Sequence, residues 1–417
     1  MSAPLPTIRP QNDAHTLPLR VCVMTDCAHG IGGMQRHTHD LIRGLVGSGH
    51  DVEVICPSDA SLDPRAYGAR WHLVDTPGRT DKRWRHKFRA TFVEADRKHP
   101  FDLVHSESTA AHGLLFKPRV TTPIVVKYHG CYLSLSKAHL RRVVQRPRTV
   151  LSEGKGFVDM TLAYLAGGEP WTFRSLVSMS PSHEQVKDTA RSMLMPTRLM
   201  HSVPNGIDAE RFRPRDRLAL RRAFDLPEGP LLVTAGRLNK EKGFDLALEA
   251  VSRIAGDYPQ ARLLILGDGE QREPLAQLAT TLGVAEKVLF LGGQPPDRVA
   301  EYFAASDVFL FPTRRHEAGP IVLLEGMACG LPTIATAIGG NTEVVRPRGR
   351  PAAGLLTPLD DGKALEGAIR SVLADDELAR TLGRRARSRI LEEYTLETMI
   401  ERTVAVYRLA IARAAIM

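Results

Sequence analysis

The sequence has no long apolar run and no grouping of cysteines. No stretch reaches the roughly 18 consecutive apolar residues of a membrane-spanning helix. The N-terminus lacks the basic start and apolar centre of a signal peptide. The five cysteines are scattered and have no metal-ligand spacing, so we expect reduced thiols, mostly in the core. These absences exclude a disulfide scaffold and favour a cytoplasmic location.

What is present is a globular composition in a long chain. The 417 residues are 43% hydrophobic and 25% charged. A single hydrophobic core rarely grows to this size, so we expect two domains. Residues 1–19 are polar and rich in proline, and we expect them to form a disordered tail.

Positive charge is concentrated in one region. The net charge is +9, yet residues 79–155 alone contain 17 Lys or Arg against 6 Asp or Glu, a difference of +11. Trp84 and Phe88 stand four apart among these cations, which suits a helix lying on an anionic membrane surface. The same region could instead hold an anionic acceptor, or form a solvated basic face.

The first half alternates strands and helices. Residues 20–25 and 51–56 predict strands, and residues 34–46 between them predict a helix. Gly33 ends the glycine-rich loop before that helix, where a backbone without side chains could approach a ligand phosphate. A plain tight turn explains this loop equally well.

A histidine follows a strand later in the same half. Residues 101–105 and 123–128 read as buried parallel strands, and His129 comes directly after the second. Ligands of open α/β sheets bind at the carboxyl ends of strands, so His129 is a candidate site residue. The alternative is a histidine that forms an ordinary hydrogen bond at a strand end.

In the second half, Arg237 and Lys242 share one loop. Residues 231–237 predict a strand and a helix is predicted from Phe244, so both cations lie between them. Two cations in such a loop could neutralise a diphosphate. Either one alone would more often be a surface charge.

Two glutamates flank a predicted helix start. Gly319 and Pro320 are expected to open a helix after the apolar strand 308–311, and the free amides there favour an anion. Glu317 stands just before this helix and Glu325 inside it. Around a bound phosphate, Glu317 would meet sugar hydroxyls and Glu325 a ribose diol. Both could also be surface charges, although Glu325 stands among apolar residues.

The motifs resemble those of retaining GT-B glycosyltransferases of glycosyltransferase family four. The resemblance rests on the spacing of Glu317 and Glu325, on the Gly-Arg and Lys-Gly pairs at 236–243, and on the Pro-Asn-Gly-Ile-Asp run at 204–208. Two departures stand out. Gly319 occupies a position that is usually aromatic in the family, and Gln35 one that is often Glu.

The resemblance implies an α/β fold of GT-B type with two Rossmann-like domains and an active site in the cleft between them. The acceptor domain would span 20–205 and the nucleotide-sugar domain 206–395, and the helix 396–417 would return to the first domain. A sugar would move from a UDP- or GDP-sugar to an acceptor hydroxyl with retention. The acceptor would belong to cell-surface polysaccharide, lipopolysaccharide or glycolipid assembly, and the protein would be cytoplasmic, with peripheral attachment at the inner face of the plasma membrane as an option.

The resemblance also implies roles for single residues. The catalytic set would be His129, Glu317, Arg237 and Lys242, and the donor would in addition contact Gly33, Gly319 and Glu325. Because no Asp-x-Asp motif is present, we expect protein cations to replace a metal ion, and no cofactor. A sugar-nucleotide epimerase and a non-catalytic partner protein of the same fold are the alternatives.

Overall fold

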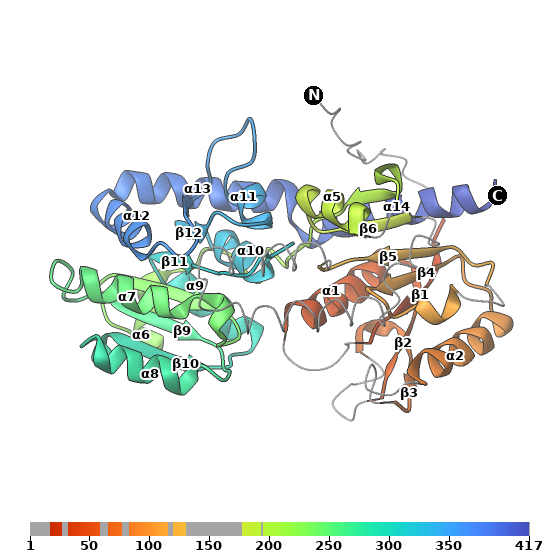
Figure 1. The fold of residues 1–417 in the computed structure, drawn as a ribbon, viewed down its shortest axis with the longest axis horizontal. Coiled ribbons are helices and arrows are strands. Elements are labelled where there is room, and N and C mark those ends of the chain that lie inside the picture. Colours follow the sequence, from red (N-terminus) through yellow and green to blue (C-terminus); the bar gives the residue numbers. More distant parts are fainter. Residues whose placement is uncertain are drawn as a thin grey trace. The chain divides into compact units, whose positions relative to one another are not determined.

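The computed structural model describes residues 17–26, 32–58, 66–76, 83–115, 120–130, 177–192 and 195–416 (Figure 1). The chain divides into two compact units. The first contains the chain up to Gly206 together with Leu396 onward, and the second contains Ile207–Thr395. The sequence had placed this boundary at 205–206. The part of the basic region 79–155 from residue 131 onward lies outside the described residues.

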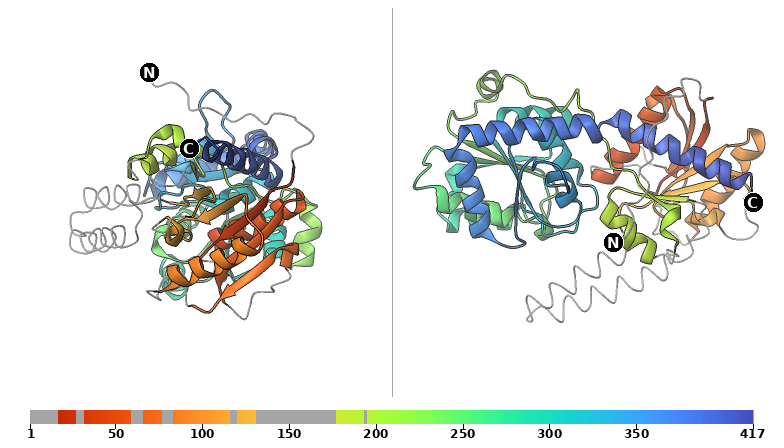
Figure 2. Two further views of the ribbon diagram at one scale, coloured as in Figure 1. Left: turned by 90° about the vertical axis from the view of Figure 1, so that its right-hand side faces the viewer. Right: turned by 90° about the horizontal axis from the view of Figure 1, so that it is seen from above.

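The first unit is built on a seven-stranded parallel sheet with the strand order β3-β2-β1-β4-β5-β6-β7. Its strands are β1 (Arg20–Met24), β2 (Asp51–Pro57), β3 (Arg70–Val74), β4 (Leu103–Glu107), β5 (Ile124–Lys127), β6 (Val177–Ser180) and β7 (Met200–Ser202). Its helices are α1 (Gly33–Gly47), α2 (Trp84–Lys98), α5 (His183–Ser192) and α14 (Leu396–Ala414). One face of the sheet packs against α1 and α14, and the other against α2 and α5 (Figure 2).

Two expectations for the first unit were wrong. Trp84 and Phe88 do not face outward: both are buried among the apolar residues that pack α2 onto the sheet, and their rings meet edge to face. A helix that packs on a sheet has the same apolar stripe as one that lies on a membrane, so the local pattern could not separate them. The tail expected over 1–19 also extended too far, since Leu19 is buried and its N–H donates to His50 Nδ1 at 3.0 Å; residues 1–16 lie outside the described residues.

The second unit repeats the architecture with six parallel strands in the order β10-β9-β8-β11-β12-β13. Its strands are β8 (Leu231–Ala235), β9 (Arg262–Leu266), β10 (Val288–Gly292), β11 (Val308–Phe311), β12 (Thr333–Thr336) and β13 (Leu355–Thr357). Its helices are α6 (Arg217–Ala223), α7 (Phe244–Ile254), α8 (Arg272–Thr281), α9 (Pro296–Ala305), α10 (Ile321–Ala328), α11 (Gly340–Val345), α12 (Gly362–Ala374) and α13 (Asp376–Glu393). Two apolar clusters cover the two faces of this sheet.

The start of α10 differs from the expectation. Pro320 is not the first helical residue: it is the N-cap, with φ −74° and ψ 98°, and the helix begins at Ile321. Because an extended residue precedes the helix here, the preceding loop that carries Glu317 and Gly319 runs one residue longer than the sequence predicted. Glu325 still lies one turn inside the helix.

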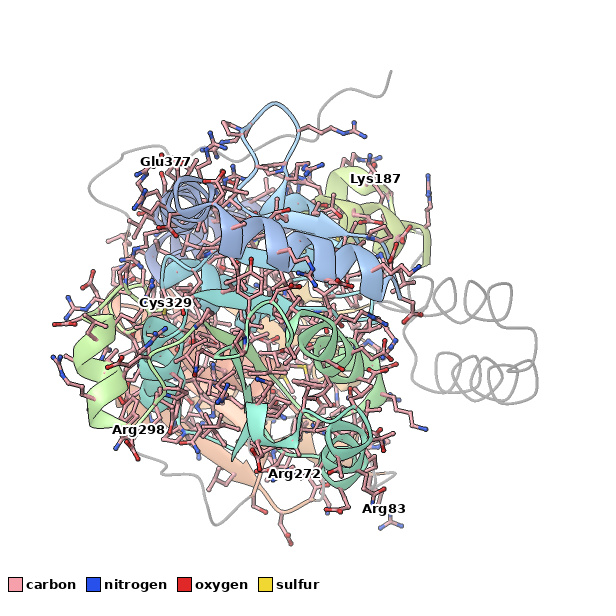
Figure 3. The ribbon with its side chains drawn as sticks, turned by 90° about the vertical axis from the view of Figure 1, so that its left-hand side faces the viewer. Arg83, Lys187, Arg272, Arg298, Cys329 and Glu377 are labelled. Atoms are coloured by element: carbon pink, nitrogen blue, oxygen red, sulfur yellow. The ribbon has the colours of Figure 1, made fainter. Side chains whose placement is uncertain are left out.

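The other sequence expectations concern thiols and membrane spans. Cys22, Cys56 and Cys329 are buried and unpaired, and Cys329 follows α10 (Figure 3). Burial raises the pKa of the Cys56 thiol to about 12. Cys27 and Cys131 lie outside the described residues. Within the described residues, no helix is both long and apolar enough to span a membrane.

Candidate active site

Both sheets reverse their strand order in the middle, and the candidate residues follow the strands at these points. In the second unit the reversal lies between β8 and β11, and in the first between β1 and β4. Chains leaving two such strands run in opposite directions around the sheet and leave a crevice at the carboxyl ends, where α/β proteins bind ligands. The loops after β8 and β11 carry Lys242 and Glu317, and α1 after β1 begins at Gly33.

Lys242 and Glu317 meet although 75 residues separate them. Lys242 Nζ lies 2.5 Å from Glu317 Oε1, and the side chains are 19% and 16% exposed. The loop before α7 approaches β11 closely at Gly243, which has φ +70°, and a Cβ there would lie 2.0 Å from the Pro312 carbonyl oxygen. Only glycine fits this position, so it holds Lys242 against the loop of Glu317.

Arg314 fixes the same loop from the other side. Its guanidinium binds Asp245 with two parallel bonds of 2.7 and 2.8 Å and also binds Asp360. It donates to the carbonyl of Lys240 at 3.1 Å, and its own N–H donates to the carbonyl of Glu241 at 2.7 Å. Burial by itself lowers the pKa of the Arg314 guanidinium, but the two carboxylates outweigh burial and raise it. Arg314 therefore stays charged and clamps the loop that carries Lys242.

Arg237 lies in this loop but is not brought to Glu317. Its side chain is exposed and makes no hydrogen bond or ion pair with another described residue. Of these two cations, Lys242 is held by Glu317, whereas the Arg237 side chain is exposed and could meet an incoming anion.

Glu325 and Gly319 are on opposite sides of the start of α10. Glu325 is 1% exposed, and burial together with the Glu325 carboxylate raises the pKa of the Cys329 thiol. Gly319 is in the loop that Gly339 and Gly340 support: the N–H of Gly340 donates to the Glu317 carbonyl at 2.7 Å. A Cβ at Gly339 would lie 2.6 Å from that carbonyl oxygen, so the glycine pair permits the close contact.

In the first unit, Gly33 and His129 lie at the same edge of the sheet. Gly33 begins α1, and Gly32 before it caps the helix without a side-chain bond, so its first amides are not capped by a side chain. His129 is 15% exposed and its Nε2 meets Glu107 Oε2. His37 packs its ring 4.8 Å from that of His129.

Sequence reasoning missed Glu107, His37 and Lys127, which surround His129. Glu107 ends β4 and pairs in register with Lys127 of β5, so the signal that identified His129 could also have identified Glu107. Burial, then the charge of Lys127, lowers the pKa of His37 to about 3. Burial lowers the pKa of Lys127 to about 8.

One group in the described part of the chain has the composition of a metal site. His37, Glu107 and His129 each offer a ligand atom, and these atoms lie within 4.8 Å of one another. Two imidazoles and a carboxylate could hold zinc. The buried amine of Lys127 beside them opposes a divalent cation, because it already supplies positive charge next to Glu107.

Two family models match the chain. "Glycosyltransferase Family 4" matches residues 31–211, and "Glycosyl transferases group 1" matches residues 216–389. The second match contains the Arg237, Lys242, Glu317 and Glu325 motifs, and the first contains Gly33 and His129.

Curated relatives share about a third of their residues with the chain over part of their length. N-acetyl-alpha-D-glucosaminyl L-malate synthase of Bacillus anthracis is 31% identical over 56% of this chain and 60% of its own length. A GDP-mannose-dependent alpha-(1-6)-phosphatidylinositol monomannoside mannosyltransferase of Mycolicibacterium smegmatis is 33% identical over 49% and 54%. The alignments thus span about half to three fifths of these relatives.

Solved structures match the whole fold. Sucrose-phosphate synthase from Thermosynechococcus elongatus superposes with a TM-score of 0.77 at 24% identity, over 95% of this chain and 100% of that one. Anabaena Alr3699/HepE, solved with UDP and glucose, gives a TM-score of 0.72 at 17% identity, over 94% and 100%. At these identities the likeness shows the fold, which is that of GT-B glycosyltransferases. With this fold and both family matches, the chain belongs to glycosyltransferase family four.

Proposed function

We propose that the protein transfers a sugar, with retention of anomeric configuration and without a metal ion, from a UDP- or GDP-sugar to an acceptor hydroxyl. The acceptor would be a glycan or glycolipid of the cell surface. The relatives support both choices of donor, since the mannosyltransferase is named as GDP-mannose-dependent and the HepE structure contains UDP. The name of the mannosyltransferase also includes a phosphatidylinositol monomannoside, which is a glycolipid.

The observation that carries the proposal is the contact between Lys242 and Glu317. A cation and a carboxylate at 2.5 Å, on two loops at the strand-order reversal, present groups for a phosphate and for sugar hydroxyls side by side. Arg237 adds a second, exposed cation on the same loop. Charge develops on the departing diphosphate in the transition state, and fixed cations stabilise that charge electrostatically.

Glu325, Gly319, Gly33 and His129 have supporting roles in the proposal. Glu325 would bind the ribose diol and Gly319 would let the donor approach the start of α10. Gly33 would offer the amides of α1 to phosphate, and His129 would face the reacting sugar. The proposal includes no protein nucleophile: the leaving phosphate would help to deprotonate the acceptor.

Lys242→Ala tests the proposal, with Lys240→Ala as the matched control. Lys240 stands in the same loop, is exposed and has only its carbonyl in the Arg314 contact. We expect Lys242→Ala to lower turnover by roughly 10²-fold, about 2.7 kcal/mol, the scale for one preorganised charge-stabilising group. Lys240→Ala should stay near wild type. Nucleotide release with a panel of UDP- and GDP-sugars measures both, and equal effects of the two variants would refute the assignment.

The same assay separates the alternative functions. An epimerase would release free nucleotide without an acceptor, and a non-catalytic protein would release none. The anomer of the product, read by NMR, decides between retention and inversion. Activity should persist in excess EDTA, whereas complete loss that Mg²⁺ or Mn²⁺ restores would show that a metal holds the diphosphate.

A further inference from the structure

Glu107 is a carboxylate enclosed by histidines. It is the last residue of β4 and 1% exposed. Its Oε2 meets His129 Nε2, and its Oε1 lies 3.2 Å from His105 Nε2 and 3.4 Å from His37 Nε2. Both carboxylate oxygens are therefore directed at imidazole nitrogens.

The surroundings keep this carboxylate ionised. Burial by itself would raise the pKa of Glu107, but the electrostatic attraction of the His129 and His37 imidazoles and the bonds from His105 and His129 outweigh burial and hold that pKa well below its usual range. Lys127, its register partner on β5, contributes a buried amine beside it. An ionised carboxylate only accepts hydrogen bonds.

This fixes the position of protons on two rings. Because Glu107 cannot donate, His129 must carry a proton on Nε2, and so must His105. His129 Nδ1 is then the nitrogen that Glu107 leaves free to bond elsewhere. His105 Nδ1 is an acceptor, and it lies 2.7 Å from the hydroxyl of Tyr407.

Tyr407 completes the chain from the last helix. Tyr407 lies in α14 and is fully buried. Its ring packs edge to face against that of His105, with 5.7 Å between the ring centroids. Burial, with the charge of Glu107, raises the pKa of the Tyr407 hydroxyl well above its usual value, so it remains a donor. The hydrogen bonds run from Tyr407 to His105, and from His105 and His129 to Glu107.

We propose that Glu107 is a positioning residue that holds His129 in the Nε2-protonated tautomer, so that His129 presents Nδ1 to the substrate, with Tyr407 and His105 bracing the carboxylate. The inference rests on the proposed function, in which His129 contacts the reacting sugar. Carboxylates that receive a bond from one imidazole nitrogen fix the ring and its tautomer in many histidine sites.

The rival is a zinc ion on His37, Glu107 and His129. A zinc bound to His129 Nε2 would replace the proton that the proposal puts there. Titration of the protein with Zn²⁺, read by calorimetry, tests this. Stoichiometric zinc binding that disappears in both His37→Ala and Glu107→Gln overturns the positioning role. The absence of zinc binding, or binding that both variants retain, supports it.

The tautomer itself is measured on the wild-type protein. Long-range ¹⁵N–¹H spectra of the imidazole rings distinguish the two tautomers, and His129→Gln identifies the signals of His129. We expect the proton on Nε2. A proton on Nδ1 with a bare Nε2 overturns the proposal, and this result needs neither activity nor a variant of Glu107.

Glu107→Gln then tests the functional consequence, with Glu94→Gln as a control on the exposed carboxylate that pairs with Lys98 on α2. We expect kcat to fall roughly 10- to 100-fold, the range for partners that orient a histidine, while KM for the donor changes less than about threefold. The Gln side chain should also lower the share of the Nε2-protonated tautomer. Unchanged kcat and tautomer overturn the proposal.

Tyr407→Phe should change kcat and the tautomer in the same direction, with a smaller effect. If wild type releases no nucleotide from any donor, the proposed function fails and the tautomer result still decides the proposal.

Discussion

Among single residues, Lys127 is the one whose burial should be visible in the pH dependence of stability. Burial lowers the pKa of its ammonium from 10.5 to about 8, against the attraction of Glu107. The unfolded chain keeps the ordinary pKa and so binds more protons between these two pH values. The destabilisation from burying the charged Lys127 is fully present below about pH 8. The contribution of Lys127 to the free energy of unfolding therefore rises as the pH increases from about 8 to 10.5.

Three buried groups of the same unit, His37, Glu107 and Tyr407, do not titrate in that range when the protein is folded. The pKa of His37 is about 3, that of Glu107 lies well below its usual value, and that of Tyr407 lies well above 10.0. We therefore expect the free energy of unfolding of wild type to increase relative to that of Lys127→Met as the pH rises above about 8. Urea unfolding at a series of pH values measures both slopes, and parallel curves would contradict the expected burial.

At the scale of one element, the loop from β8 to α7 depends on Arg314. Arg314→Lys keeps one charge but cannot bind Asp245 through two parallel bonds while also reaching Asp360 and the loop carbonyls. We expect KM for the donor to rise several-fold, with a smaller change in kcat, because the loop that carries Lys242 loses its anchor. Arg315→Lys is the control. The Arg315 side chain is about half exposed, and its contact with Glu241 is a long, exposed ion pair of 3.7 Å between Nη1 and Oε2. Equal KM values for the two variants would argue against the clamp.

The same element requires glycine at one position. Gly243 has φ +70° and has no room for a Cβ beside the Pro312 carbonyl, whereas Gly256 has open space around it. We expect Gly243→Ala to lower the free energy of unfolding by at least about 2 kcal/mol, from the left-handed conformation and the backbone clash together. Gly256→Ala should have little effect. Chemical denaturation compares them, and a Gly243→Ala variant as stable as wild type would show that the two loops are not in this contact.

At the scale of the whole molecule, the described residues of the basic region 79–155 that can attract a membrane are charged ones. Trp84 and Phe88 are buried, so they are not free to insert among lipids. Arg83 and Lys87 are exposed, and Arg83 projects outward in Figure 3. Each basic residue near an anionic surface contributes roughly 1 kcal/mol, and the attraction decays within about 8 Å at physiological salt.

We therefore expect binding to anionic vesicles that salt removes completely and that charge reversal at Arg83 and Lys87 weakens. Reversal at Arg298, which is also exposed and belongs to the second unit, is the control. Sedimentation with anionic and neutral vesicles measures binding. Equal binding to both, or none at low salt, excludes the membrane and leaves an anionic soluble acceptor or a solvated basic face as the alternatives.

The sequence by itself determined the features that depend on neighbours along the chain. Apolar runs and amphipathic stretches predicted β8, β11 and the start of α7 closely, because burial on both faces of a parallel sheet requires continuous apolar strands. The placement of Arg237 and Lys242 in one loop followed from these bounds alone. The spacing of Glu317 and Glu325 followed in the same way. Pro320, which we expected to be the first residue of the helix, is instead its N-cap.

Only the tertiary structure decided which distant groups meet. Lys242 reaches Glu317 because β8 and β11 are neighbours in the sheet, and strand order is not written in local periodicity. Glu107 meets His129 for the same reason across β4 and β5. The burial of Trp84 and Phe88 was likewise decided by the tertiary structure. An apolar stripe on a helix fits a sheet and a membrane equally well, and in the folded chain the stripe of α2 packs on the sheet. Contacts between residues far apart depend on how parallel strands are ordered, and that order is a property of the folded chain.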